Sequence, residues 1–123
     1  MKRVAACILL AGLTPVLYGA DVQWKYWAAS AAVHAAGTSA DAYSSWHQVE
    51  NNRLLCGANG QFGARGVGFK IGTFAAVTGV EYGVLRLTHS RRAAKAFIVV
   101  NFVLGTGYGA IAARNFRVQG DRE

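Results

Sequence analysis

The sequence predicts an all-α integral membrane protein, a helical bundle of three core transmembrane helices that follow an N-terminal, signal-like apolar segment. Its composition is 53% hydrophobic and only 15% charged, whereas a soluble domain carries about 25% charged residues. Residues 66–87 and 94–114 are apolar segments of about membrane-spanning length joined by a short basic turn, which is the pattern of a transmembrane hairpin. Residues 24–49 are alanine-rich and begin with an aromatic cluster typical of a membrane interface, which predicts a third helix.

The first twenty residues have the layout of a targeting segment. Lys2 and Arg3 precede an apolar stretch that extends to Tyr18, so residues 1–20 are expected to be a signal peptide or an N-terminal membrane anchor. Both alternatives stay open, because Tyr18 stands where a cleavage site calls for a small residue. The remainder divides into a single membrane domain, residues 21–118, and a polar tail, residues 119–123.

The net charge of +7 does not by itself indicate nucleic acid. Basic residues lie mostly at the ends of the apolar segments, as Lys2, Arg3, Arg86 and Arg114 do, where they suit phospholipid headgroups. We therefore expect the lipid bilayer, and no nucleic acid, as the partner of these charges. The basic residues are too evenly divided between the two sides to fix the orientation in the membrane.

Five polar residues fall inside the predicted spans: His34, Asp41, Lys70, Glu81 and Asn101. An ionisable group in hydrocarbon costs at least about 2.5–3.5 kcal/mol and tends to face a partner. With a rise of about 1.5 Å per residue and antiparallel neighbours, these residues sort into two depths. The sequence predicts one intramembrane layer that pairs Asp41 with Lys70 and another that joins His34, Glu81 and Asn101.

Two interpretations of these layers remain open. Interhelical hydrogen bonds stabilise many inert membrane bundles by roughly 0.6 kcal/mol each, which makes the layers structural. Alternatively, His34 and Glu81 belong to a proton or ion relay, since histidine and carboxylates recur along such paths. Three spans enclose little water, so a relay would require an oligomer. A structural layer should tolerate Glu81→Gln, whereas a relay should not.

Small residues at four-residue spacing predict close helix packing. Ala28, Ala32, Ala36 and Ala40 form a stripe on the first predicted span. The later spans carry three GxxxG pairs, a pattern that permits close helix approach; these pairs are Gly68 with Gly72, Gly79 with Gly83, and Gly105 with Gly109. The close contacts would form within one chain or between chains, so a homo-oligomer or another membrane protein is an expected partner.

Catalytic and cofactor motifs are not found in the sequence. The glycine-rich segment 57–66 matches neither phosphate-binding pattern, and His47 with Glu50 supplies only two metal ligands where a closed site needs three or four. We expect no cofactor, no metal and no catalytic residue. The predicted role is a structural or interaction subunit of a membrane complex, with a relay and then a membrane-embedded enzyme as alternatives, and a soluble helical protein as the rival fold.

A longer pattern, extending from residue 41 to residue 102, carries a resemblance. It consists of Asp41, Ser44-Ser45, Glu50-x-Asn52-x-Leu54-Leu55, Gly60-x-Phe62-Gly63, Gly66, Lys70 and Asn101-Phe102. In this respect the chain resembles small bacterial inner-membrane proteins of unknown function, in which a helix with an aspartate and hydroxyl residues leads into a Glu-x-Asn-Pro-Leu element. Arg53 stands at a position where proline is common in those proteins. The resemblance implies a multi-helix protein of the bacterial inner membrane and no particular activity.

Overall fold

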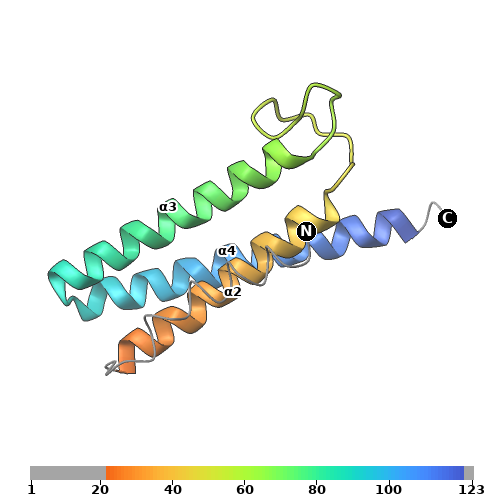
Figure 1. Ribbon diagram of the computed structural model, residues 1–123. Helices are drawn as coiled ribbons and strands as arrows, with labels where there is room; N and C mark the ends of the chain where they lie inside the picture. The colour runs from red at the N-terminus through yellow and green to blue at the C-terminus, as the bar shows by residue number, and fades with distance from the viewer. Residues whose placement is uncertain (1–21, 121–123) are drawn as a thin grey trace.

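The computed structural model describes residues 22–120, which form three helices: α2 (Val22–Ser44), α3 (Ala64–Thr88) and α4 (Arg91–Gly120). The all-helical prediction is confirmed for this part of the chain. Figure 1 shows α2 and α4 lying side by side, with α3 joined to α4 by a short turn at one end and diverging from the pair toward the other end. The expected signal peptide or anchor, residues 1–20, lies outside the described residues.

Helices α2 and α4 pack along a face with alternating three- and four-residue spacing. On α2 the buried positions include Trp27, Ser30, His34, Gly37 and Asp41, a spacing that keeps one face toward a neighbouring helix. On α4 the buried residues are Ala94, Asn101, Gly105 and Ala112. The predicted alanine stripe is not this face, because Ala36 is exposed and Ala32 and Ala40 are only half-buried.

Two glycines set the closeness of this packing. A Cβ atom placed on Gly105 would lie 2.5 Å from the Val33 carbonyl oxygen and 2.8 Å from the His34 amide nitrogen, and a Cβ atom on Gly37 would collide with the main chain of Gly105. The atoms in the way are backbone atoms, which cannot rotate aside as a side chain can. The two helices therefore approach at a distance that only glycine permits at these positions.

The α3–α4 turn is fixed by local hydrogen bonds. His89 adopts a left-handed conformation, with φ of 51°, and its amide donates to the Leu85 carbonyl oxygen at 3.0 Å, as is common at a helix C-terminus. Ser90 Oγ then accepts a hydrogen bond from the Ala93 amide at 3.2 Å, which caps the first turn of α4. Next to this turn, Trp27, Ala28, Leu85 and Ala94 form the main apolar cluster.

The helix boundaries lie within three residues of those predicted, except at two helix C-termini. Helix α2 ends at Ser44 instead of continuing to residue 49, and α4 continues to Gly120 instead of ending near residue 114. The chain leaves α2 because His47 has a φ of 65° and its amide donates to the Phe62 carbonyl oxygen at 3.0 Å. Segment 45–63 thus folds back on itself, with isolated antiparallel bridges between Val49 and Gln61 and between Cys56 and Phe62.

Helix α3 is held loosely. Its buried residues are Gly66, Glu81 and Leu85, near its two ends, while Phe69, Ile71 and Val80 are exposed. Among the described residues, α4 is the one helix long and apolar enough to cross a membrane by length and composition. The three-span membrane arrangement therefore stays a prediction, whereas the helical bundle with one candidate apolar span is a property of the structure.

Candidate functional site

A buried polar layer joins all three helices near the α3–α4 turn. Glu81 of α3 is 3% exposed, and its Oε2 accepts hydrogen bonds at 2.8 Å from both Trp27 Nε1 and Asn101 Nδ2. Asn101, which has no exposed surface, also contacts His34 Nδ1 through its Oδ1 at 3.0 Å. The amide of Asn101 makes a longer contact of 3.4 Å with Ser30 Oγ. The three polar residues placed at one depth by the sequence, His34, Glu81 and Asn101, are thus in one connected network.

The network fixes the hydrogen positions of His34. Because a carboxylate only accepts, the Asn101 atom facing Glu81 is the amide nitrogen, and the atom facing His34 is the carbonyl oxygen. His34 Nδ1 must therefore carry a proton and donate to Asn101. In the neutral ring the other nitrogen, Nε2, is then the unprotonated one. The ring itself stacks on Tyr108 at 6.1 Å between centroids and meets Phe74 edge-on at 5.0 Å.

The link between His34 and Glu81 is an amide. Asn101 separates the two titratable groups and satisfies both with hydrogen bonds, but a carboxamide does not readily take up and release a proton. Trp27 Nε1 is likewise a donor only. The buried carboxylate is therefore surrounded by hydrogen-bond donors, and an amide stands between it and His34.

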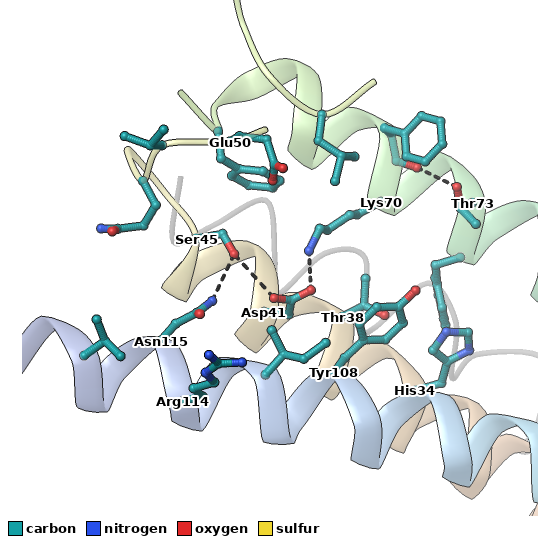
Figure 2. Close-up of a pocket in the computed structure, with 18 residues that line it drawn as sticks. His34, Thr38, Asp41, Ser45, Glu50, Lys70, Thr73, Tyr108, Arg114 and Asn115 are labelled. Carbon is teal, nitrogen blue, oxygen red and sulfur yellow. Dashed lines mark hydrogen bonds and ion pairs between the residues drawn. The ribbon is translucent and has the colours of Figure 1, made fainter. Parts of the chain in front are cut away.

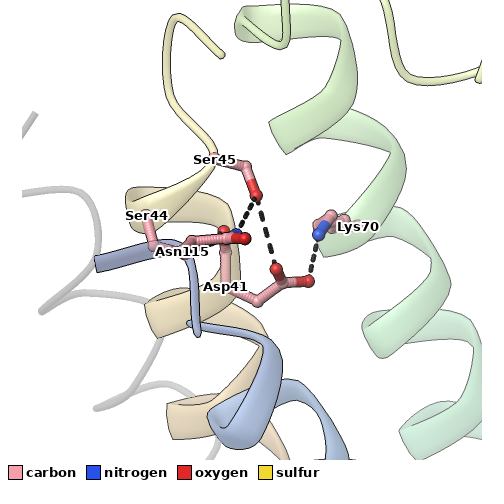
Figure 3. Close-up of polar contacts among 5 residues, drawn as sticks. All are labelled: Asp41, Ser44, Ser45, Lys70 and Asn115. Carbon is pink, nitrogen blue, oxygen red and sulfur yellow. Dashed lines mark hydrogen bonds and ion pairs between the residues drawn. The ribbon is translucent and has the colours of Figure 1, made fainter. Parts of the chain in front are cut away.

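The second layer lies toward segment 45–63. Lys70 Nζ of α3 contacts Asp41 Oδ2 of α2, and the side chains are 14% and 4% exposed. The ammonium also lies over the rings of Phe62, at 5.1 Å from the centroid, and Tyr108, at 5.8 Å, positions in which a cation is attracted to the ring. Figure 3 shows Lys70 reaching from α3 across to Asp41, with the Ser45 hydroxyl at the other oxygen of the carboxylate.

Two amides of α4 complete this layer at the end of α2. Asn115 Nδ2 donates to Ser44 Oγ at 3.2 Å and to Ser45 Oγ at 3.3 Å, and Gln119 Nε2 donates to the Ser44 carbonyl oxygen at 2.7 Å. The last carbonyl groups of a helix have no partner within the helix. Gln119 therefore caps the C-terminus of α2 from the neighbouring helix, and it ties α4 to the point where the loop begins.

A cavity of about 650 Å³ opens where α3 diverges from the α2–α4 pair. Figure 2 shows Asp41 and Lys70 meeting within it, with Thr38 and His34 from α2 and Tyr108 from α4 close by. Its apolar surface comes mainly from Phe62, Phe69, Phe74 and Ile111. The hydroxyl Oγ1 of Thr38, a residue 7% exposed, is buried without a hydrogen-bond partner among the described residues. The cavity therefore combines an apolar wall, an ion pair and an unsatisfied hydroxyl.

The glycines predicted to pack helices behave differently from one another. Gly105 contacts α2, as described above, but a Cβ atom placed on any of the others would meet nothing within 4 Å; these are Gly68, Gly72, Gly79, Gly83 and Gly109. At about 100° per residue, the four of these glycines that lie on α3 fall within roughly 60° of one another and about opposite to Lys70 and Glu81. They therefore face away from α2 and α4, so among the glycines predicted to pack helices only Gly105 makes a close contact within the described part of the chain, and packing between chains stays a prediction.

Several members of the two layers were not predicted: Trp27, Ser30, Asn115, Gln119 and Gly37. Asn115 lies two heptads beyond Asn101, so the same seven-residue repeat that links Asn101 to Tyr108 would have reached it. The prediction stopped at residue 114 because the charged residues there resemble a membrane flank. Gly37 carries no pattern that distinguishes it from the neighbouring alanines, and only the contact with Gly105 identifies it.

Comparison of the chain with protein-family models, curated proteins and solved structures finds no match in any of the three. Function must therefore be argued from the geometry of the helices, the two polar layers and the cavity.

Proposed function

We propose that the chain is a small integral membrane protein of the bacterial inner membrane and serves as a structural or interaction subunit of a membrane assembly. The observation that carries the proposal is the distribution of polarity. Seven polar or charged side chains are buried between the helices, whereas several valines and phenylalanines, such as Val80, Val103 and Phe102, are exposed. The buried polar residues are Ser30, His34, Thr38, Asp41, Ser44, Glu81 and Asn101.

The outward residues support the same proposal. Val80 and Val103 are each 65% exposed and Val99 is 61% exposed, in the middle parts of α3 and α4. Large exposed apolar patches are rare on soluble monomers and mark contacts with a membrane or with another protein. In a bilayer, by contrast, outward valine and phenylalanine side chains contact lipid, and polar side chains are directed into the bundle. The same arrangement explains why the buried core is otherwise made largely of alanine, since little apolar surface needs to be hidden from lipid.

The geometry favours the structural role over the relay. Glu81 is held by two N–H donors, and the amide of Asn101 stands between it and His34. A relay would need a group that can exchange protons at that position. The interaction role is supported by the glycine face of α3, which is directed away from the other helices; a second copy of the chain is the partner we propose for the assembly.

Alkaline carbonate extraction of membranes from cells that express the full chain tests the membrane location. We expect the protein in the pellet. Val103→Lys should lower the pelleted fraction, because a lysine near a helix centre costs about 2.5–3.5 kcal/mol of insertion free energy. The matched control is Val49→Lys, at a position that is 81% exposed in segment 45–63, which should leave the distribution unchanged. Release of the unmodified protein into the supernatant would overturn the proposal.

Chemical crosslinking in the native membrane tests the assembly. We expect a crosslinked dimer or small oligomer of the chain, and we expect Gly79→Leu to weaken it because the added side chain prevents close helix approach. Gly109→Leu adds the same side chain at a position of α4 that has no neighbour within 4 Å, and it serves as the control for a general effect of side-chain size. Crosslinking only to a different membrane protein would replace the self-association proposal, and a monomer without partners would contradict the interaction role.

A further inference from the structure

The cavity between α3 and the α2–α4 pair contains hydrogen-bonding capacity that the two layers do not use. Thr38 lines the cavity and is 93% buried. Its hydroxyl Oγ1 is buried and has no hydrogen-bond partner in the described part of the chain. Leaving a buried hydroxyl unsatisfied is unfavourable. The Lys70 ammonium donates one N–H to Asp41, and because an ammonium group has three N–H donors, two remain. The cavity therefore offers at least two kinds of free donor to an acceptor oxygen.

The charges around the cavity balance. Its lining includes two cations, Lys70 and Arg114, and two carboxylates, Asp41 and Glu50. A charged ligand would be attracted by the two groups of opposite charge and repelled by the two of like charge, whereas an uncharged ligand meets no such repulsion. The remaining lining is aromatic and aliphatic, and the volume of about 650 Å³ lies within the range of about 300–1,000 Å³ that is usual for small-molecule sites.

We propose that this cavity binds an uncharged lipid whose carbonyl oxygens accept hydrogen bonds from Thr38 and Lys70, while its apolar part lies against Phe69, Phe74 and Ile111. Two sources share this chemistry: the ring carbonyls of a quinone and the ester carbonyls of a diacylglycerol. The ligand reaches the cavity where α3 diverges from α2 and α4 (Figures 1 and 2). The inference goes beyond the proposed role as a subunit and rests on the cavity itself.

The experiment is native mass spectrometry of the full chain purified in detergent and titrated with three probes: decylubiquinone, dioctanoylglycerol and oleate. We expect one of the two uncharged probes to bind with one-to-one stoichiometry and to compete successfully with oleate, which is anionic at neutral pH. Because the titration is carried out in detergent, its result is independent of whether the chain is extracted from membranes by carbonate. Failure of this inference and failure of the membrane proposal are thus distinguishable.

Three variants locate the binding. Thr38→Val removes the hydroxyl at nearly constant volume and should weaken the bound probe about five- to tenfold, the effect of one hydrogen bond. Thr38→Ser keeps the hydroxyl and should retain binding. The matched control is Thr78→Val: Thr78 Oγ1 is also buried without a partner in residues 22–120, but Thr78 does not line the cavity, so its loss should leave affinity unchanged.

Each outcome decides the proposal. Binding of decylubiquinone that Thr38→Val weakens supports a quinone, and the same pattern with dioctanoylglycerol supports a glyceride. Three results would overturn the proposal: oleate binds more tightly than both uncharged probes, neither uncharged probe binds, or Thr38→Val does not alter the affinity of the probe that binds. The competition with oleate requires no variant, so the proposal can be refuted even if Thr38→Val does not fold.

Discussion

The main chains of Gly37 on α2 and Gly105 on α4 are in direct contact, and this contact sets the distance between the two helices. It lies between the polar layer of His34 and Asn101 and the polar layer of Asp41 and Lys70. Both layers need α2 and α4 to be close, because each contains a direct hydrogen bond between them: His34 with Asn101 in one and Ser44 with Asn115 in the other. The glycine pair therefore holds the helices at a separation that allows both networks to form.

Gly105→Ala should destabilise the fold. Its Cβ atom would lie 2.5 Å from the Val33 carbonyl oxygen, so the helices must separate, at a cost of about 1–3 kcal/mol by analogy with overpacked cores. Gly109→Ala, one turn further along α4, should be tolerated because nothing lies within 4 Å of the added atom. Thermal unfolding in detergent measures both. Equal melting temperatures for the two variants would show that this close contact does not determine the stability of the fold.

Asp41→Ala should lower the stability by leaving Lys70 without its carboxylate. Loss of one partner of a largely buried polar pair costs about 1–3 kcal/mol, and the side chains here are 4% and 14% exposed. The double variant Asp41→Leu with Lys70→Met should recover much of that loss, since an apolar pair leaves no charge unpaired. SDS titration of the folded protein provides the comparison. Unchanged stability of both Asp41→Ala and Lys70→Ala would argue against the pairing as a stabilising contact.

Glu81→Gln should be mild and Glu81→Leu severe. The glutamine carbonyl oxygen can still accept hydrogen bonds from Trp27 Nε1 and Asn101 Nδ2, which lie 2.8 Å from the present carboxylate oxygen, so we expect a loss below about 1 kcal/mol. Leucine leaves both donors buried and unsatisfied, at about 1–3 kcal/mol for each. Unfolding in detergent distinguishes the two variants. A loss for Glu81→Gln as large as for Glu81→Leu would point to a need for the charge itself.

Gln119→Ala should loosen the end of α2 without disturbing the rest of the bundle. The variant removes the 2.7 Å hydrogen bond from Gln119 Nε2 to the Ser44 carbonyl oxygen, which is worth about 1 kcal/mol. Hydrogen exchange should therefore become faster in segment 45–63 and remain slow around Trp27. Arg117→Ala, at an exposed position of the same helix, is the control. Unaltered exchange in segment 45–63 would show that α2 does not depend on this cap.

The amino-acid sequence was enough to predict an all-helical chain and to sort five polar residues of the predicted spans into two depths. His34, Glu81 and Asn101 lie at one depth of the three predicted spans, and Asp41 and Lys70 lie at another. The members of each group are in contact in the structure. The reason is physical: a buried polar side chain must find a partner, and helical rise leaves few at the same depth. Side-chain chemistry thus restricted the arrangement before any packing was known.

Only the tertiary structure decided how closely, and through which faces, the helices meet. Glycines recur on α3 and α4 with equal regularity, yet Gly105 packs against α2 while Gly68 and Gly72 face away from it. A glycine has no side chain whose burial would stabilise one face over another, so its spacing permits a contact without requiring one. The cavity beside Thr38 likewise depends on contacts between residues far apart in the sequence, such as Lys70 with Asp41 and Asn115 with Ser45.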